Sequence, residues 1–212
     1  MLNNLFLELT TRCALACPAC VRTIYPGQYI SADLSLDVIR NLAADKLQYR
    51  HIILSGNHGD PIYHPKFHEI LKILVDLPGS PSLGISTNGS YRDEVWWRET
   101  ASILRRQDSV TFGADGLQDT AKIYRVNMDW DSVVRGMRTL KSFGQCMVVW
   151  QWILFRHNQH QLVEAREVCD SLGIDKFEIV LSFRDAMADK LAPTITLKEA
   201  YEQFRQKDLS PM

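Results

Sequence analysis

Three cysteines near the amino terminus have a spacing that can hold an iron–sulfur cluster. Cys13, Cys17 and Cys20 form a C-x-x-x-C-x-x-C arrangement in the 212-residue chain. Three thiolates from one short loop can each ligate one iron of a cubane [4Fe–4S] cluster. The sequence has no other cysteine nearby, so the fourth iron would keep an open position. Metal catalysis needs an open position, whereas structural metal sites tend to be closed.

Two other interpretations of this cysteine loop stay open. A zinc-stabilised binding module normally needs four protein ligands, and only His58 or His64 could complete such a set through the fold. An iron–sulfur electron carrier would be better served by a closed cluster with four thiolates.

Three further segments, at residues 55–61, 86–89 and 113–116, combine glycines with polar side chains that suit a small charged cofactor. Glycines let the backbone approach a ligand closely, and the Asp60 carboxylate can accept hydrogen bonds from an ammonium group. Any of these segments taken alone could be an ordinary turn. The candidate cofactor-binding residues are Gly56, Asn57, Gly59, Asp60, Ser86, Asn88, Asp115, Arg125 and Gln151, and the candidate metal ligands are Cys13, Cys17 and Cys20.

Short β-rich runs alternate with stretches of helical periodicity along the chain. We expect strands at residues 5–11, 51–56, 82–87, 109–114, 146–155 and 176–183, and helices at 35–47, 65–77, 92–106, 129–143, 160–172 and 197–206. Such alternation indicates parallel strands joined by right-handed crossovers. Six units are too few for a closed eight-unit barrel, so the sequence predicts an α/β fold, a partial (β/α)6 TIM-like barrel with a curved parallel sheet.

Several predicted strands carry a polar residue between apolar neighbours. Side chains alternate between the two faces of a strand, so these residues could line the barrel lumen. They are Glu8, Ser55, Ser86, Thr111, Gln151 and Glu178. A buried carboxylate is costly unless it is paired or hydrogen-bonded. Glu8, Gln151 and Glu178 are therefore the candidates for catalytic or substrate contacts, although each could instead lie at a wet strand edge.

Bulk composition narrows the class of protein. The net charge of −1 gives no support for a nucleic-acid or membrane-surface binder. The sequence has no apolar run long enough to span a membrane and no secretory signal pattern, so we expect a cytoplasmic protein. We expect a core domain over residues 1–190 and a helical tail over 191–212 that packs on it.

The cysteine loop, together with these glycine-rich segments, resembles the radical S-adenosylmethionine (SAM) superfamily. Its branch of molybdenum-cofactor and peptide-modifying enzymes is the most similar, and the resemblance covers the catalytic core only. The chain departs from many members at Ala19, where they have an aromatic residue, and this should loosen packing beside the cluster. The tail has no cysteines for an auxiliary cluster.

The resemblance implies both cofactors and a reaction. The open iron would chelate the amino and carboxylate groups of SAM, and reductive cleavage would give a 5′-deoxyadenosyl radical that removes hydrogen from a substrate. Residues Gly56 to Asp60 would bind the SAM amino group, and Ser86 to Asn88 would face its ribose and methionine end. Arg125 would hold the SAM carboxylate or would form a surface salt bridge. The expected partners are a peptide or small-metabolite substrate and a reductant such as flavodoxin or ferredoxin.

Overall fold

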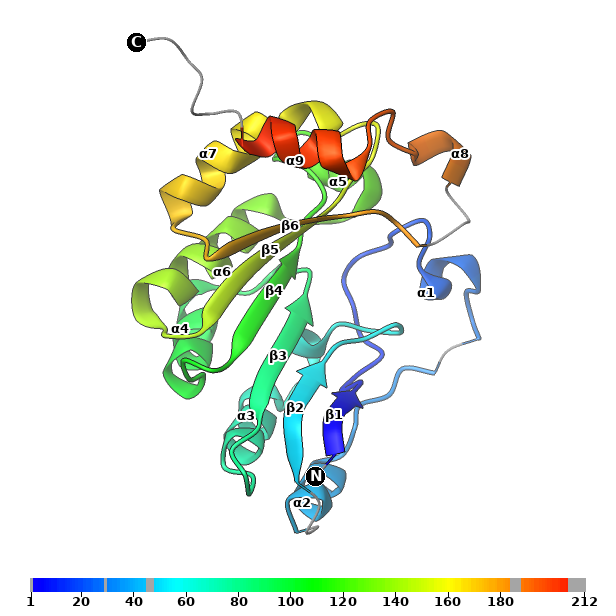
Figure 1. The fold of residues 1–212 in the computed structure, drawn as a ribbon. Coiled ribbons are helices and arrows are strands. Elements are labelled where there is room, and N and C mark those ends of the chain that lie inside the picture. The colour runs from blue at the N-terminus through cyan, green and yellow to red at the C-terminus, as the bar shows by residue number, and fades with distance from the viewer. Residues whose placement is uncertain (1, 29, 45–47, 184–187, 206–212) are drawn as a thin grey trace.

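The computed structural model describes residues 2–28, 30–44, 48–183 and 188–205. Six strands pair in chain order, all parallel, to form one curved sheet (Figure 1). The strands are β1 (Leu2–Leu7), β2 (Tyr49–Leu54), β3 (Ser82–Thr87), β4 (Ser109–Gly113), β5 (Met147–Ile153) and β6 (Lys176–Val180). The predicted partial (β/α)6 barrel with a curved parallel sheet is confirmed.

Helices follow the strands and complete the βα units. The longer helices are α2 (Leu36–Ala44), α3 (Phe67–Val75), α4 (Glu94–Ile103), α6 (Trp130–Phe143), α7 (Leu162–Leu172) and α9 (Leu197–Arg205). Short elements lie in the loops: α1 (Val21–Ile24), α5 (Ala121–Tyr124), α8 (Ala188–Leu191) and the 3-10 turns η1 (Pro61–Tyr63) and η2 (Gln159–Gln161). The short helices were not predicted, because four residues make too little of a helix to show a 3.6-residue period.

Side chains at the helix ends account for several boundaries. Ser35 accepts a hydrogen bond from the Val38 amide, as expected of an N-cap. Asp93 and Asp129 cap α4 and α6 in the same way. Gly173 ends α7 in the left-handed conformation, with φ of 66°, which favours glycine. The last part of the predicted helix 35–47 lies outside the described residues.

The first strand differs from its predicted range. The sequence predicted residues 5–11, but β1 ends at Leu7. Beyond it, Thr10 forms an isolated antiparallel bridge with Asp33, and its hydroxyl donates to the Asp33 carboxylate at 2.6 Å. The chain leaves the sheet after Leu7 because the partner strand β2 ends opposite it, at Leu54. The segment around Thr10 then pairs with residues that precede α2.

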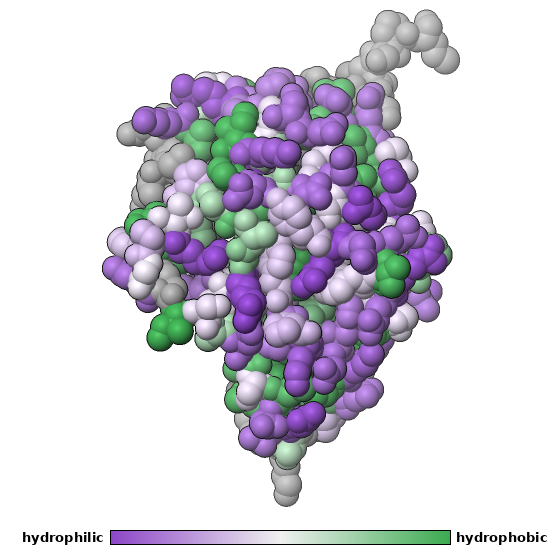
Figure 2. Space-filling model, turned by 180° about the vertical axis from the view of Figure 1, so that it is seen from behind, coloured by the Kyte–Doolittle hydropathy of each residue, from purple (hydrophilic) through white to green (hydrophobic). Residues whose placement is uncertain are grey.

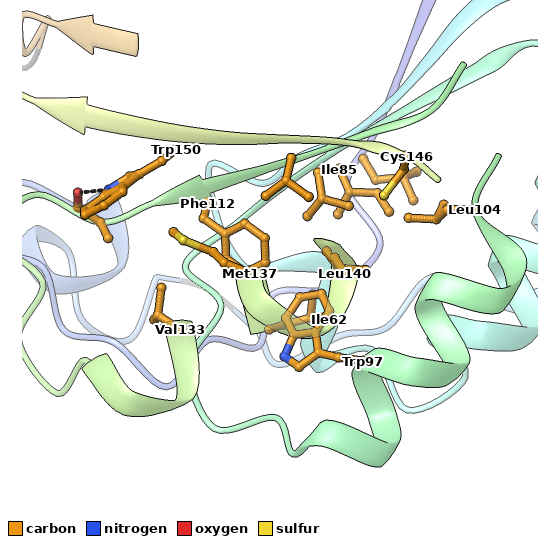
Figure 3. Packing of buried hydrophobic residues seen from close by; sticks show 14 of the residues in the cluster. Ile62, Ile85, Trp97, Leu104, Phe112, Val133, Met137, Leu140, Cys146 and Trp150 are labelled. Atoms are coloured by element: carbon orange, nitrogen blue, oxygen red, sulfur yellow. Dashed lines mark hydrogen bonds between the residues drawn. The ribbon is translucent and has the colours of Figure 1, made fainter. Parts of the chain in front are cut away.

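Aromatic and aliphatic side chains fill the space between the sheet and helices α4 and α6. Figure 3 shows Phe112 and Trp150 of the sheet facing Met137 and Trp97 of the helices. A Cβ atom at Gly136 would lie 2.7 Å from the Trp97 ring, so this glycine lets α6 approach α4 closely. Close packing of this kind makes the strand ends a rigid support for the loops that follow them.

The outside of the molecule is mainly polar. Figure 2 shows hydrophilic residues over most of the reverse face, with hydrophobic residues in small separate groups. Within the described ranges, no helix has both the length and the apolar character needed to cross a bilayer.

The last helix packs against the sheet edge at β6. The Tyr201 hydroxyl accepts from the Ile179 amide at 3.0 Å, and the Phe204 ring stacks on Phe177 with centroids 4.3 Å apart. These contacts suit a tail that packs on the core. The proposed division at residue 190 stays a prediction, and the end of the expected tail, 206–212, lies outside the described residues.

Candidate cluster and cofactor site

One cavity of about 220 Å³ collects most of the residues that the sequence singled out. It lies where the carboxyl ends of the parallel strands meet the cysteine loop, as expected for an α/β sheet. Its lining includes Cys13, Cys17, Cys20, Gly56, Asn57, Gly59, Asp60, Ser86, Asn88, Arg125 and Gln151. Asp115, Glu8 and Glu178 are not part of the lining and lie next to residues that are.

The three cysteines are free, half-buried thiols that face this cavity. The loop that carries them is held by backbone hydrogen bonds, including Cys20 N to Cys17 O at 3.0 Å and Ala16 N to Val126 O at 3.1 Å. The Arg22 guanidinium donates to the Cys13 carbonyl oxygen at 3.3 Å. Backbone hydrogen bonds and Arg22 therefore help to fix the shape of the loop.

Ala19 is buried at the cysteine loop, and the expected looser packing beside an iron–sulfur cluster stays a prediction. It is buried against the rings of Tyr124 and Phe155, and Cys17 packs on the same cluster. The two rings lie 4.5 Å apart. Aromatic side chains from the loop after β4 and the end of β5 thus supply the packing that residue 19 itself lacks.

Burial changes the protonation of two of the three thiols. Burial, with a smaller effect of the Asp60 carboxylate, raises the pKa of Cys13 to about 11, and burial also raises the pKa of Cys17. Cys13 and Cys17 therefore keep their protons at neutral pH until a metal replaces them. Among the described residues, no three His, Cys, Asp or Glu side chains are placed to hold a single metal ion. A cubane has no such requirement, because each thiolate binds a different iron. The donor set thus fits a [4Fe–4S] cluster.

The glycine-rich loop after β2 lies directly against the cysteine loop. A Cβ atom at Gly59 would be 2.0 Å from the Thr10 carbonyl oxygen, so only glycine fits there. The next residue, Asp60, donates its backbone N–H to the Arg12 carbonyl oxygen at 2.8 Å. The spacing between the cysteines and this loop is thus fixed by backbone contact.

Glu8 anchors the glycine-rich loop from the other side. Its carboxylate accepts from the backbone amides of Asn57 at 3.1 Å and His58 at 3.3 Å. Partial burial raises the pKa of Glu8, but these hydrogen bonds outweigh it and leave the pKa below its ordinary value. The carboxylate is therefore ionised at neutral pH and already engaged with the loop.

Asp60 organises the end of β3. The carboxylate, 5% exposed, accepts from the Thr87 hydroxyl at 2.8 Å and from the Asn88 backbone amide at 2.6 Å. It also accepts from the Asn88 side-chain amide and the Ile62 backbone amide. Burial raises the pKa of Asp60 to about 6 against the opposing effect of these hydrogen bonds.

Arg125 is held over the cavity by Asp115. The Asp115 carboxylate is fully buried, and it accepts from Arg125 Nε at 2.6 Å and from the Ile153 backbone amide at 2.7 Å. A Cβ at Gly113 would lie 2.8 Å from the guanidinium, so this glycine makes room for Arg125. Burial lowers the pKa of Arg125, but Asp115 and Cys17 outweigh it and raise the pKa above its ordinary value. Arg125 therefore lines the cavity and is paired with a buried carboxylate rather than in a surface salt bridge, and its contact with the SAM carboxylate stays a prediction.

The polar strand residues divide into two groups. Ser55, Ser86, Thr111 and Gln151 line the cavity. Gln151 donates through Nε2 to the Glu178 carboxylate at 3.4 Å, and Glu178 also pairs with Lys176. Of the three catalytic candidates, Gln151 lines the cavity, and Glu178 accepts a hydrogen bond from it.

Sequence reasoning missed several residues of the site. The hydroxyl of Tyr63, in η1, lies 3.0 Å from the Ser90 carbonyl oxygen and 3.3 Å from Asn88 Oδ1, and it shares its one hydrogen between them. Arg22 and Tyr124 line the cavity. Arg22 could have been noticed because it lies two residues after Cys20. Nothing in the sequence pattern marks Tyr63, whose position depends on the packing of two loops.

Comparison with known proteins identifies the family. Residues 7–169 match the radical SAM superfamily, and the chain belongs to that superfamily. The family's cofactors are a [4Fe–4S] cluster and SAM.

Two curated relatives and one solved structure illustrate the similarity. The tungsten-containing aldehyde ferredoxin oxidoreductase cofactor-modifying protein of Pyrococcus furiosus is 31% identical over 183 residues, which cover 82% of this chain and 50% of that protein. The pre-heme d1 synthase of Dinoroseobacter shibae is 27% identical over 175 residues, covering 80% of this chain and 41% of that protein. The chain spans half or less of the length of these relatives. The structure of native anSMEcpe with bound AdoMet shares the fold, with a TM-score of 0.68 at 14% identity, over 96% of this chain and 58% of that one.

Proposed function

We propose that this protein is a radical SAM enzyme whose cluster is held by Cys13, Cys17 and Cys20. The single observation that carries the proposal is that three free thiols line one cavity together with the glycine-rich loop after β2. When bound, a reduced cluster would supply the electron that splits the SAM sulfonium to a 5′-deoxyadenosyl radical, which takes hydrogen from an organic substrate. Membership of the family supports this chemistry over an electron carrier or a zinc module.

The residues around the cavity then have separate roles. The loop of Gly56, Asn57 and Gly59 offers backbone groups to the SAM amino group, with Asp60 behind it. Arg125 presents a cationic fork toward the SAM carboxylate. Ser86 faces the space left for the ribose and methionine end. Gln151, backed by Glu178, is the candidate to touch substrate.

The substrate proposal favours a small metabolite over a peptide. Both curated relatives have names that concern the making or modification of a cofactor, which supports a substrate of cofactor-like chemistry. A small electron-transfer protein such as flavodoxin or ferredoxin would supply the electron. The polar lining by Ser55, Thr111 and Gln151 suits a substrate that carries hydrogen-bonding groups.

The test is reductive SAM cleavage by anaerobically reconstituted protein. We expect four irons per chain, and release of 5′-deoxyadenosine and methionine after addition of dithionite and SAM. Cys17→Ala should abolish both cluster and cleavage, while Cys169→Ala, a buried cysteine of α7 outside the cavity, should keep them. A stable cluster that never cleaves SAM would refute the proposal, and so would zinc in place of iron in anaerobically purified protein.

A further inference from the structure

Asn88 has an unusual position at the end of β3. It is 5% exposed, and its side-chain amide reaches between the Asp60 carboxylate and the sulfur of Cys13. The Nδ2 atom lies 3.5 Å from Cys13 Sγ, a hydrogen-bonding distance for sulfur. The same side chain therefore touches the glycine-rich loop and a proposed cluster ligand.

Both hydrogens of the Asn88 side-chain amide are used within the protein. The two Nδ2 hydrogens point to Asp60 and Cys13. Oδ1 accepts from the Ser90 backbone amide at 3.0 Å. The Tyr63 hydroxyl lies 3.3 Å from Oδ1 and 3.0 Å from the Ser90 carbonyl oxygen, and it shares its one hydrogen between them. A side-chain amide has two N–H donors, so Asn88 keeps no donor for a direct bond to SAM.

The surroundings also fix which end of the amide faces the sulfur. An ionised Asp60 carboxylate can only accept, and the Ser90 backbone amide can only donate. Rotating the amide by 180° would therefore set oxygen against oxygen and N–H against N–H. Nδ2 must point toward Asp60, which places its second hydrogen toward Cys13.

Cys13 receives a second donor from its own loop. The Leu15 backbone amide lies 3.4 Å from Cys13 Sγ. Hydrogen bonds to the sulfurs of an iron–sulfur cluster stabilise the added negative charge of the reduced state and so raise its reduction potential. The Leu15 bond belongs to the cysteine loop itself, whereas the Asn88 bond comes from a strand end that the Asp60 carboxylate holds in place.

We propose that Asn88 is a positioning residue that donates a hydrogen bond to Cys13 Sγ and thereby raises the reduction potential of the cluster, rather than a contact to SAM. This inference rests on the proposed function, because it requires a cluster on Cys13. It assigns the Asp60 carboxylate and the Ser90 backbone amide the role of orienting the amide of Asn88.

The test is a redox titration of reconstituted protein without SAM, followed by electron paramagnetic resonance. Asn88→Ala should retain four irons and show a more negative midpoint potential than the parent. Asn88→Ser is the second variant, because its shorter hydroxyl also cannot reach Cys13 and it keeps a polar group at the turn. Tyr63→Phe is the matched control, because it leaves Asp60 and Ser90 to hold the amide, and its potential should stay close to that of the parent.

Resonance Raman spectroscopy gives an independent readout. Loss of a hydrogen bond to a thiolate strengthens its iron–sulfur bond, so an iron–thiolate stretching band should move to higher frequency in both Asn88 variants and stay unchanged in Tyr63→Phe.

The outcomes separate this inference from the proposed function. If the parent cleaves SAM but both Asn88 variants keep its potential and Raman bands, the inference fails and the enzyme remains. A tenfold weaker SAM affinity in these variants with no shift in potential would also overturn it, because Asn88 would then act on SAM. Equal shifts in Tyr63→Phe would assign the effect to general cavity polarity. If the parent binds no cluster, the proposed function itself fails.

Discussion

Substitution of Gly59 by alanine tests how closely the glycine-rich loop and the cysteine loop must approach. The added Cβ would lie 2.0 Å from the Thr10 carbonyl oxygen and 2.9 Å from the Thr11 carbonyl carbon, both backbone atoms that cannot rotate away. Ordinary Cβ contacts begin at 3.4 Å, so the two loops must separate by about 1.4 Å. That separation would break the hydrogen bond from Asp60 N to Arg12 O.

The expected cost has two parts. Overpacking typically destabilises by about 1–3 kcal/mol, and the lost backbone hydrogen bond adds about 1 kcal/mol. We therefore predict that Gly59→Ala lowers the free energy of unfolding by roughly 2–4 kcal/mol. For a chain of this size that corresponds to a midpoint temperature lower by about 5–15 °C.

The assay is urea unfolding of the cluster-free protein, followed by circular dichroism, with iron content measured after reconstitution. Gly84→Ala in β3 is the matched control. Its Cβ would meet only side-chain atoms at 3.7 and 3.9 Å, so its stability should stay within about 0.5 kcal/mol of the parent. Gly59→Ala should also incorporate less iron, because the cysteine loop moves. A Gly59→Ala protein as stable as Gly84→Ala would refute the close-contact argument.

Three further predictions concern buried groups. Asp115→Asn should destabilise by about 3–5 kcal/mol in urea unfolding, because it leaves the Arg125 guanidinium without its anion; a change below about 1 kcal/mol would show that Arg125 finds another partner. The pKa of Asp60 is raised from its ordinary 3.8 to about 6, so the folded state holds a proton that the unfolded state has lost between these values. The stability contributed by Asp60 should therefore fall by up to about 3 kcal/mol as pH rises from 4 to 7. The check is the stability difference between the parent and Asp60→Asn at each pH, and a difference that does not vary with pH would contradict it. Met137→Ala, in the core shown in Figure 3, should lower the free energy of unfolding by about 2–5 kcal/mol in the same assay. A loss below about 1 kcal/mol would mean that α6 and its neighbours repack into the space left by the methionine side chain.

The order and type of the main elements followed from the sequence. Alternating short apolar runs and amphipathic stretches predicted six parallel strands with helices between them, because the two periodicities differ and crossovers favour one hand. The range of β3, 82–87, agreed with the prediction. The range of β1 did not, because the pairing of Thr10 with Asp33 depends on a segment more than 20 residues away.

The sequence also predicted the kind of site, a cluster and cofactor site, because cysteine spacing and loop glycines are local features. Cys13, Cys17 and Cys20 needed only one short loop, and their proximity to Gly59 followed from the parallel sheet, which gathers its strand ends at one edge. The sequence did not predict the role of each polar residue. A motif specifies a residue type, whereas a role depends on which hydrogen-bonding positions the neighbours have already taken.

Tertiary structure decided those roles. Glu8 was a catalytic candidate by sequence, yet its carboxylate holds the amides of Asn57 and His58. Asn88 was a candidate SAM contact, yet its side-chain amide forms hydrogen bonds with neighbours that include Cys13 and Tyr63. These partners lie 25 to 75 residues apart in the chain. The sequence alone determined the parallel sheet and predicted the three sulfur ligands, because both rest on local pattern. Only the folded structure determined how the polar groups are shared, because hydrogen bonds depend on distances that no spacing along the chain records.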